Sequence, residues 1–395
     1  MNVLLTGGRA PATLELARLL HRAGHTIDVA ESAPIHLCSR SRAVRRNVLV
    51  AAPACEPHRF AADVAAACVD GKIHLLIPTC EEIFFVAAQA GRIRQLIADT
   101  GRQPPAILCD NLATLRSLHH KFEFTQVAAA AGLAVPQTWL LTSPDELPAF
   151  GEQSVVFKPV WSRFATQVHL PPHTARSLAA LRPTLTAPWV AQTFLSGRSL
   201  CSYSIAAHGR LLAHACYPVN FRAGNGAAID FTGEENEAVL AWVSRFVAHT
   251  GFHGQIAFDF IQPPGAPLMA IECNPRTTSG LHLLAAAPGF ASLLAALAGE
   301  GELPGSAIAP PLGERAALRS ALLLYGAGQV RSANDLQRWW TALRSRDVLT
   351  APGDWGPLGA QPAIIRLYQK WSRQHNIDLI AATTVDIAWN GEELP

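Results

Sequence analysis

The stretch QIAFDFIQPPGAPLMAIECNPR, residues 255–276, decides the fold because it places acidic side chains on what read as two neighbouring strands. Apolar runs on either side of the turn-forming QPPGAP predict two strands joined by a tight connection. If residues 264–267 form the loop, Asp259 lies opposite Glu272. Cross-strand neighbours lie about 5 Å apart, and two carboxylates at that distance repel each other unless a cation lies between them. The sequence therefore predicts a metal site on this hairpin.

The second strand carries polar side chains at alternate positions, Glu272, Asn274 and Arg276. Because successive side chains of a strand point to opposite faces, we expect these three on one face and Ile271 and Cys273 on the other. The alternative is an ordinary polar strand face open to water. Carboxylate and amide oxygens are hard ligands, which suit Mg²⁺ or Mn²⁺ rather than zinc. Arg276 adds a planar fork that matches phosphate or carboxylate oxygens.

Composition narrows the class of protein. With 395 residues, 49% of them hydrophobic and 16% charged, the chain is expected to form a compact globule of two or three domains. A net charge of +2 argues against a nucleic-acid or membrane-surface partner. The eight cysteines form no CxxC pair, and MNVLLTGGRA lacks the pattern of an export signal, so a reducing, cytoplasmic location is expected.

One uncharged segment, residues 277–299, is long enough to span a bilayer. It contains His282, Pro288 and Gly289, and it follows the polar strand directly. We therefore expect buried helices of a soluble core, and no membrane partner.

Strands and helices alternate over the first 110 residues. The predicted elements are NVLLT (2–6), a Gly7-Gly8 turn into a helix, HTIDVAE (25–31), HLLIPTCEE (74–82) and AILCD (106–110). Such alternation favours an open, doubly wound parallel sheet with ligands at the carboxyl ends of its strands. Glu81 and Glu82 lie at one such end, where they either bind substrate or are solvated. The glycines do not spell G-x-G-x-x-G, so a nicotinamide cofactor is not expected.

From residue 111 onward the pattern changes. Residues 111–132 predict one helix that ends at Gly132, and residues 201–219 predict a hairpin turned at His208-Gly209. Residues 331–347 predict a late helix. The final ATTVDIAW, residues 382–389, is interpreted as either a capping strand or a contact in a homodimer.

Two lysines stand out in the middle of the chain. Lys158 lies inside the apolar strand VVFKPV, where a buried ammonium is costly unless an anion pairs with it. Lys121 follows two histidines on the predicted helix, where an exposed surface lysine is the ordinary alternative. Together the two lysines could hold a polyphosphate.

In this order, Lys121, Lys158, Gln192 to Leu195, Asp259 and Glu272-x-Asn274-Pro275-Arg276 resemble the ATP-grasp superfamily. The likeness is closest to the carbamoyl-phosphate synthase large-chain-like and amino-acid ligase branches, and it covers about residues 1 to 300. The resemblance implies an α/β and α+β chain, with an N-terminal doubly wound sheet followed by a two-lobed ATP-grasp fold. The domains it implies are a Rossmann-like domain (1–112), a small lid subdomain (113–191), a central subdomain (192–303) and a closing segment (304–395).

The resemblance also implies roles for individual residues. The residues it assigns to ATP are Lys121, Lys158, Ser162, Gln192, Thr193, Phe194 and Leu195, the last four as an interdomain hinge around adenine. It places Mg²⁺ (or Mn²⁺) on Asp259, Glu272 and Asn274. Arg276 would stabilise the transferring phosphoryl group, with Lys158 as a further catalytic cation; Arg163 is predicted as a third such cation outside the family's pattern.

One departure from the family concerns the flap at 161–167. Many relatives have glycines there, whereas KPVWSRFATQ supplies Ser162, Arg163 and Thr166 instead. Backbone amides are then less available to phosphate, and the charge of Arg163 is expected to replace them.

The resemblance implies an ATP- and Mg²⁺-dependent ligase that joins a small-molecule carboxylate and an amine through an acyl phosphate, releasing ADP and phosphate. Phosphoryl transfer is mainly a matter of positioning and charge neutralisation, which two lysines, an arginine and a metal can supply. The alternatives are activation of bicarbonate, as in carbamoyl-phosphate synthases and carboxylases, and a nucleotide-binding protein without turnover.

Overall fold

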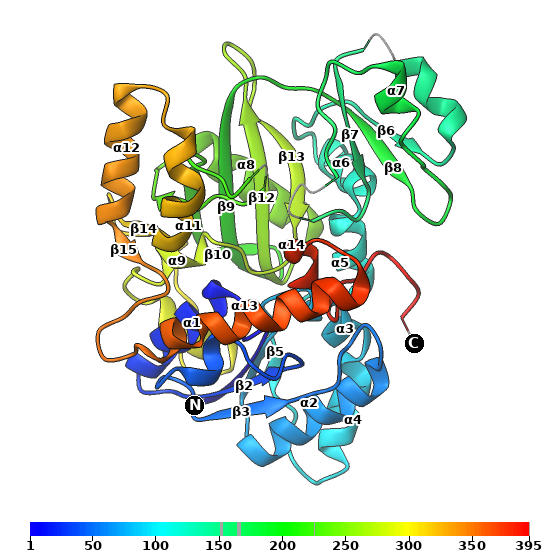
Figure 1. The fold of residues 1–395 in the computed structure, drawn as a ribbon. Coiled ribbons are helices and arrows are strands. Elements are labelled where there is room, and N and C mark those ends of the chain that lie inside the picture. Colours follow the sequence, from blue (N-terminus) through cyan, green and yellow to red (C-terminus); the bar gives the residue numbers. More distant parts are fainter. Residues whose placement is uncertain (151–152, 164–166, 225, 395) are drawn as a thin grey trace.

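The computed structural model describes residues 1–150, 153–163, 167–224 and 226–394. Its first part is a parallel sheet of five strands in the order β3-β2-β1-β4-β5 (Figure 1). Alternate residues of β1 enter different cores, Val3 and Leu5 with helix α1 and Leu4 with helix α2. Helices therefore cover both faces, which confirms the predicted doubly wound sheet. The elements are β1 (Asn2–Thr6), α1 (Pro11–Arg22), β2 (Thr26–Glu31), η1 (Leu37–Arg40), β3 (Arg46–Leu49), α2 (Pro57–Gly71), β4 (Leu75–Ile77), α3 (Glu82–Ala88), α4 (Ala90–Ala98) and β5 (Ala106–Ile107).

The helix predicted over residues 111–132 is wrong as a single element, because the structure has two helices, α5 (Leu112–His119) and α6 (Lys121–Ala130). His120 interrupts them with an extended backbone, and its ring accepts a hydrogen bond from the amide of Glu123 as the cap of α6. The break turns Lys121 inward at the start of the new helix, where its side chain is 2% exposed. The alternative of an exposed surface lysine is therefore wrong.

A small antiparallel sheet follows, with strand order β6-β8-β7. Its strands are short, and its own apolar core includes Leu141, Phe150, Phe157 and Ala191. It forms a separate lobe at the upper right of Figure 1. The elements are β6 (Thr138–Leu141), η2 (Pro144–Phe150), β7 (Val155–Pro159), α7 (Ala175–Leu178) and β8 (Trp189–Thr193).

The central sheet is antiparallel and has the strand order β10-β9-β12-β13. Helix α8 packs its aromatic side chains Trp242 and Phe246 against Phe258 on β12. The hairpin turn at His208-Gly209 is confirmed, and both residues have positive φ, as a tight two-residue turn requires. The elements are β9 (Arg198–Ala207), β10 (Arg210–Pro218), β11 (Asp230–Thr232), α8 (Glu237–Thr250), β12 (Gly254–Gln262) and β13 (Met269–Asn274).

The uncharged segment after β13 folds into two short buried helices, α9 (Leu281–Leu284) and α10 (Phe290–Leu297). Both join the core that also contains α1 and the central sheet. Within the described ranges, no helix combines the length and the apolar character that crossing a bilayer demands.

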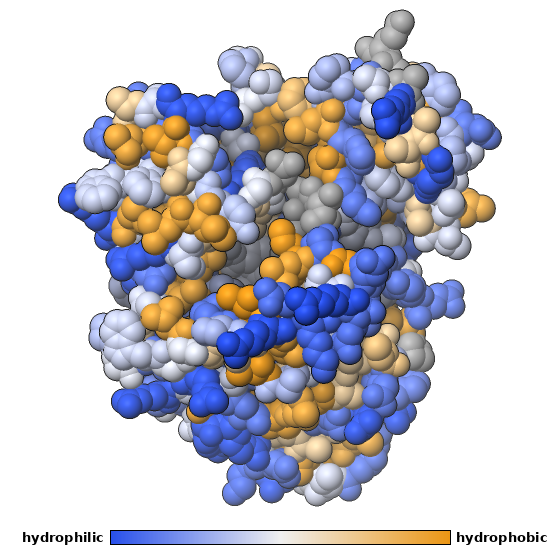
Figure 2. Space-filling model, viewed as in Figure 1, coloured by the Kyte–Doolittle hydropathy of each residue, from blue (hydrophilic) through white to orange (hydrophobic). Residues whose placement is uncertain are grey.

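The closing segment packs against all three preceding parts. Strands β14 and β15 extend β11 into a small sheet, and helix α13 runs between the N-terminal sheet and the upper lobes (Figure 1). Ile364 and Tyr368 lie on the buried face of α13, whereas its outer face is a band of hydrophilic side chains (Figure 2). Residues 382–389 form the end of a short helix and turns, so the capping strand is wrong. The elements are β14 (Arg315–Ala317), α11 (Arg319–Ala321), η3 (Leu322–Gly326), η4 (Ala327–Gln329), α12 (Ala333–Arg344), β15 (Arg346–Asp347), α13 (Gly356–His375) and α14 (Leu379–Ala382).

Candidate active site

The hairpin of β12 and β13 brings the two acidic residues together as the sequence predicts. Asp259 pairs directly with Glu272 in the antiparallel register. The thiol of Cys201 on β9 donates to Asp259 Oδ1 over 2.9 Å, and the amide of Asn274 lies 3.5 Å from Oδ2. Desolvation and the nearby charge of Glu272 raise the pKa of Asp259 above its ordinary value. A cation at this position would relieve that repulsion.

A β-bulge at Ile271 corrects one detail of the predicted strand. The register shifts between Asp259 and Phe260, so Ile271 has no partner on β12 and is only partly buried, unlike Cys273. Its carbonyl oxygen accepts a hydrogen bond from Lys158 Nζ over 3.1 Å. The bulge therefore supplies the carbonyl oxygen that links the hairpin to Lys158 of the small sheet. Bulges commonly redirect backbone and side-chain groups beside functional sites.

Lys158 lies between the small and the central sheets. Its ammonium donates to Gln192 Oε1 over 3.0 Å as well as to the carbonyl of Ile271. Burial is the main cause that lowers the pKa of Lys158 to about 8; the charge of Glu272 opposes this shift, and the charge of Lys121 adds to it. A desolvated lysine with two neutral acceptors is poised to gain from an incoming anion.

Lys121 links three segments. Its Nζ is 3.3 Å from Glu272 Oε1, and it donates to the carbonyl oxygens of Ser162 over 2.8 Å and Val160 over 3.3 Å. The two lysines and the acidic pair thus form one cluster between the lobes. Ser162 contributes its backbone carbonyl oxygen to this cluster. Thr166, the remaining flap residue predicted from the sequence, lies outside the described residues.

The segment predicted as a hinge connects two sheets. Gln192 and Thr193 end β8 of the small sheet, Phe194 and Leu195 follow, and β9 of the central sheet begins at Arg198. Phe194 is 39% exposed, and its amide donates to the carbonyl of Ser154. Gln192 fixes the start of this connection because its amide donates to Thr138 Oγ1 over 3.0 Å.

The two arginines predicted to be catalytic share one counterion, Glu81. Arg276 Nε lies 2.8 Å from Glu81 Oε1, and Arg163 Nε lies 2.8 Å from Oε2. Burial alone would raise the pKa of Glu81, but the two arginines outweigh it and hold the value at about 2. Arg163 also donates to the carbonyl of Trp389 and to Asn390 Oδ1 over 3.0 Å. The loop after β4 and the C-terminal segment therefore both reach the flap.

The donor set fits a hard divalent cation. Asp259 and Glu272 supply carboxylate oxygens and Asn274 an amide oxygen, the ligand types that Mg²⁺ and Mn²⁺ take. Across the ranges that the structure describes, no group of three or more His, Cys, Asp and Glu side chains is arranged to hold a metal. Two carboxylates with an amide are consistent with an ion that keeps waters and is held partly by phosphate oxygens.

No family model and no curated protein matches the sequence, but solved structures match the architecture. N5-carboxyaminoimidazole synthetase from Staphylococcus aureus in complex with ADP has a TM-score of 0.60, covering 83% of this chain and 85% of that one at 13% identity. L-amino acid ligase from Bacillus licheniformis gives 0.57, covering 76% of each chain at 16% identity. The chain has the ATP-grasp fold. This confirms the predicted fold class.

A third ATP-grasp structure is the biotin carboxylase domain dimer of the Hydrogenobacter thermophilus 2-oxoglutarate carboxylase, complexed with MgADP, ADP and bicarbonate. It has a TM-score of 0.59 and 10% identity, and covers 77% of this chain and 71% of that one.

Sequence reasoning missed that Glu81 organises the arginines. The available signal was its position at the carboxyl end of β4, where α/β sheets place ligands. The contribution of the C-terminal residues had no sequence signal, because a carbonyl oxygen such as that of Trp389 carries no residue-type information.

Proposed function

We propose that this protein is an ATP- and Mg²⁺-dependent ligase that joins the carboxylate of one small molecule to the amine of another, releasing ADP and phosphate. The observation that carries the proposal is the facing pair Asp259 and Glu272, with two buried lysines beside it, between two antiparallel sheets. Buried ion pairs add little net stability, and clusters of buried charged groups with shifted pKa values are found mainly at functional sites. The ATP-grasp fold supports a nucleoside triphosphate as that ligand.

In the proposed reaction, a substrate carboxylate oxygen attacks the γ-phosphorus of ATP and ADP leaves. The amine nitrogen then attacks the acyl carbon, phosphate departs and one proton is lost. Lys121 and Lys158 would bind phosphate oxygens, and residues 192–195 would contact the adenine. Arg276 would stabilise charge on the transferring phosphoryl group, and Arg163 would assist once its contact with Glu81 is exchanged.

A divalent cation on Asp259, Glu272 and Asn274 would supply charge neutralisation for the triphosphate. We further propose that the chain consists of four parts, residues 1–112, 113–191, 192–303 and 304–395. The small lobe, 113–191, would then close over the nucleotide and exclude water, because an acyl phosphate is hydrolysed readily.

The test is ADP release from ATP with panels of carboxylates and amines, each omitted in turn. The proposal requires ADP and phosphate formation that depends on both partners, together with an amide product detected by mass spectrometry. Formation of AMP and pyrophosphate would contradict it. So would nucleotide turnover that no carboxylate stimulates.

A second candidate is the activation of bicarbonate to carboxyphosphate. It is favoured by the structural match to two proteins whose names indicate carboxylation, the S. aureus synthetase and the H. thermophilus domain. ADP release that requires bicarbonate and no other carboxylate would select this candidate over the amide ligase.

A further inference from the structure

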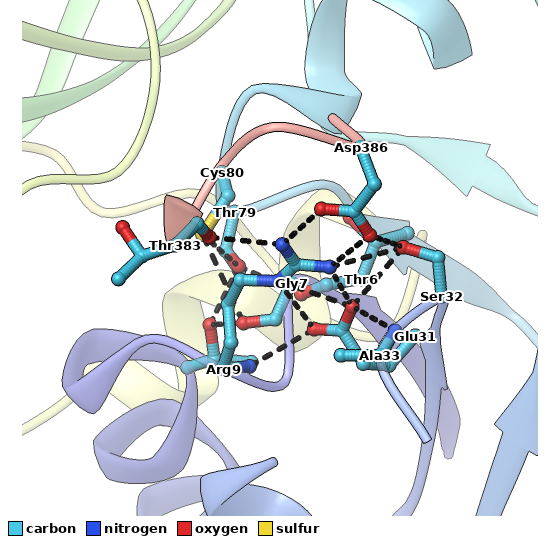
Figure 3. Close-up of polar contacts among 11 residues, drawn as sticks. Thr6, Gly7, Arg9, Glu31, Ser32, Ala33, Thr79, Cys80, Thr383 and Asp386 are labelled. Carbon is cyan, nitrogen blue, oxygen red and sulfur yellow. Dashed lines mark hydrogen bonds and ion pairs between the residues drawn. The ribbon is translucent and has the colours of Figure 1, made fainter. Parts of the chain in front are cut away.

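The last residues of the chain form a strap, defined here as residues 383–394, that runs from the N-terminal sheet to the flap. At its first end Asp386 lies against Arg9, with Nη1 to Oδ1 at 2.6 Å and Nη2 to Oδ2 at 2.8 Å (Figure 3). Ser32 Oγ donates to the same carboxylate over 2.7 Å. The carbonyl of Thr383 accepts a further bond from Arg9 Nη1 over 2.9 Å. Both oxygens of Asp386 are thus bound as a free carboxylate would be.

Residues of the N-terminal sheet position Arg9 for this contact. Arg9 follows the turn after β1, and Glu31 at the end of β2 accepts hydrogen bonds from its Nε, its Nη2 and its backbone amide. The Arg9 side chain is 4% exposed, and its outer fork of two Nη groups faces the strap. The position is the carboxyl edge of the parallel strands, where β1 has its two neighbours on opposite sides. Open α/β sheets bind ligands at this topological switch point.

Glu82 is an additional buried group beside this fork. Neither of its carboxyl oxygens has a hydrogen-bond partner among the residues that the structure describes. Burial and the charge of Glu31 raise the pKa of Glu82 to about 8. A carboxyl group with such a pKa is mostly protonated near neutral pH, so beside a carboxylate-binding arginine it can donate a hydrogen bond to an entering carboxylate without repelling it.

The other end of the strap is tied to the flap. The carbonyl of Trp389 and the side chain of Asn390 both accept bonds from Arg163. The Trp389 ring is buried and packs on Phe84 and Trp161, with centroids 4.8 Å and 5.3 Å away. One short segment of chain therefore contacts Arg9 in the first sheet and Arg163 beside the proposed nucleotide site.

We propose that Arg9 and Ser32 bind the carboxylate of the amine substrate, which is then an amino acid by class, and that Asp386 occupies this site as a tethered mimic. An entering amino acid displaces Asp386, and the strap then gives up its contacts with Arg163, which leaves Glu81 as the contact that Arg163 must exchange to reach the phosphates. This inference rests on the proposed function, since it names the amine substrate of that reaction. On this proposal, the strap would couple binding of the amine substrate to the position of Arg163.

The experiment is hydrogen exchange of the strap amides in the full-length protein, without nucleotide. A mixture of the proteinogenic L-amino acids is compared with ethylamine and ethanolamine, which lack the carboxylate. The amino acids are expected to speed exchange of residues 383–394 by about tenfold, the order of effect of losing charge-assisted hydrogen bonds. The two amines should leave it unchanged. Equal responses to both probes, or a response to neither, would overturn the inference.

Two strap variants complete the test. In Asp386→Asn, the strap amides should exchange rapidly without any added amino acid. Glu393→Gln removes one charge from an exposed strap residue, and its strap amides should exchange as in the wild type. A strap as protected in Asp386→Asn as in the wild type would overturn the tethered-mimic role. Thermal melting of both variants confirms that the rest of the chain is folded. Because no nucleotide is present, failure of ADP release would contradict the proposed function without changing these exchange results.

Discussion

Replacing Lys158 by Met gives the sharpest separation between a binding role and a structural role. The Lys158 ammonium is buried, and its two acceptors, Gln192 Oε1 and the carbonyl of Ile271, are neutral. Desolvation is already costly for this charge, as the lowered pKa of about 8 indicates. Methionine fills a similar volume without that cost.

The substitution is expected to change nucleotide affinity strongly and the free energy of unfolding only slightly. Loss of a charge-assisted bond to phosphate is worth about 1.5–3 kcal/mol, which corresponds to roughly 10- to 150-fold weaker nucleotide binding. Stability should change little, because removing the desolvated ammonium offsets the acceptors left unpaired, each worth about 1 kcal/mol. We therefore expect a large loss of affinity at nearly constant melting temperature.

The assay is titration calorimetry with a non-hydrolysable ATP analogue and Mg²⁺, alongside thermal melting. Lys370→Met serves as the matched control, since Lys370 is exposed on α13 away from the site. Unchanged affinity in Lys158→Met would refute the reasoning. A loss of affinity accompanied by a large drop in melting temperature would assign the residue a structural role instead.

Three further outcomes are expected. Nucleotide affinity should fall as pH rises through about 8, by up to about tenfold per pH unit, because Lys158 loses its proton there; Lys158→Arg should abolish this dependence, and a flat wild-type profile would contradict it. Gly197→Ala should destabilise the chain by about 2 kcal/mol in urea unfolding, because its Cβ would lie 2.3 Å from the carbonyl oxygen of Gln262. Gly305→Ala, which meets nothing within 4 Å, is the neutral control, and equal stability of the two variants would refute the steric argument. Chelation of divalent cations should weaken nucleotide binding in the wild type more than in Glu272→Gln; equal weakening would place the metal elsewhere.

The sequence predicted the pairing of Asp259 with Glu272 correctly, because strand periodicity placed both residues on their strands. The register next to the turn, where Ile261 pairs with Met269, differs by one residue from the predicted one, and the bulge at Ile271 restores the predicted pairing. The doubly wound sheet was equally predictable, since alternation of strands and helices is a local pattern. The prediction that failed was the single helix over residues 111–132, where the local sequence signal for a break is weak. The break at His120 has no glycine or proline, and its cap is an imidazole ring rather than one of the usual capping side chains.

Contacts between distant segments were beyond sequence reasoning. The pairing of Arg163 and Arg276 with Glu81 joins parts of the chain that are 82 residues or more apart. The strap likewise depends on a backbone carbonyl and on the packing of Trp389, which residue types alone do not specify. Motif spacing predicts which groups could bind ATP, whereas the fold decides which of these groups are paired with one another.

The most direct test of the central claim is calorimetry of the ATP analogue with Mg²⁺ in the wild type and in Asp259→Asn. If this acidic hairpin holds the metal that accompanies the triphosphate, the wild type will bind with measurable heat only when Mg²⁺ is present. The variant will then lose that Mg²⁺ dependence. No binding heat in the wild type, or Mg²⁺-dependent binding of equal affinity in Asp259→Asn, would contradict the account.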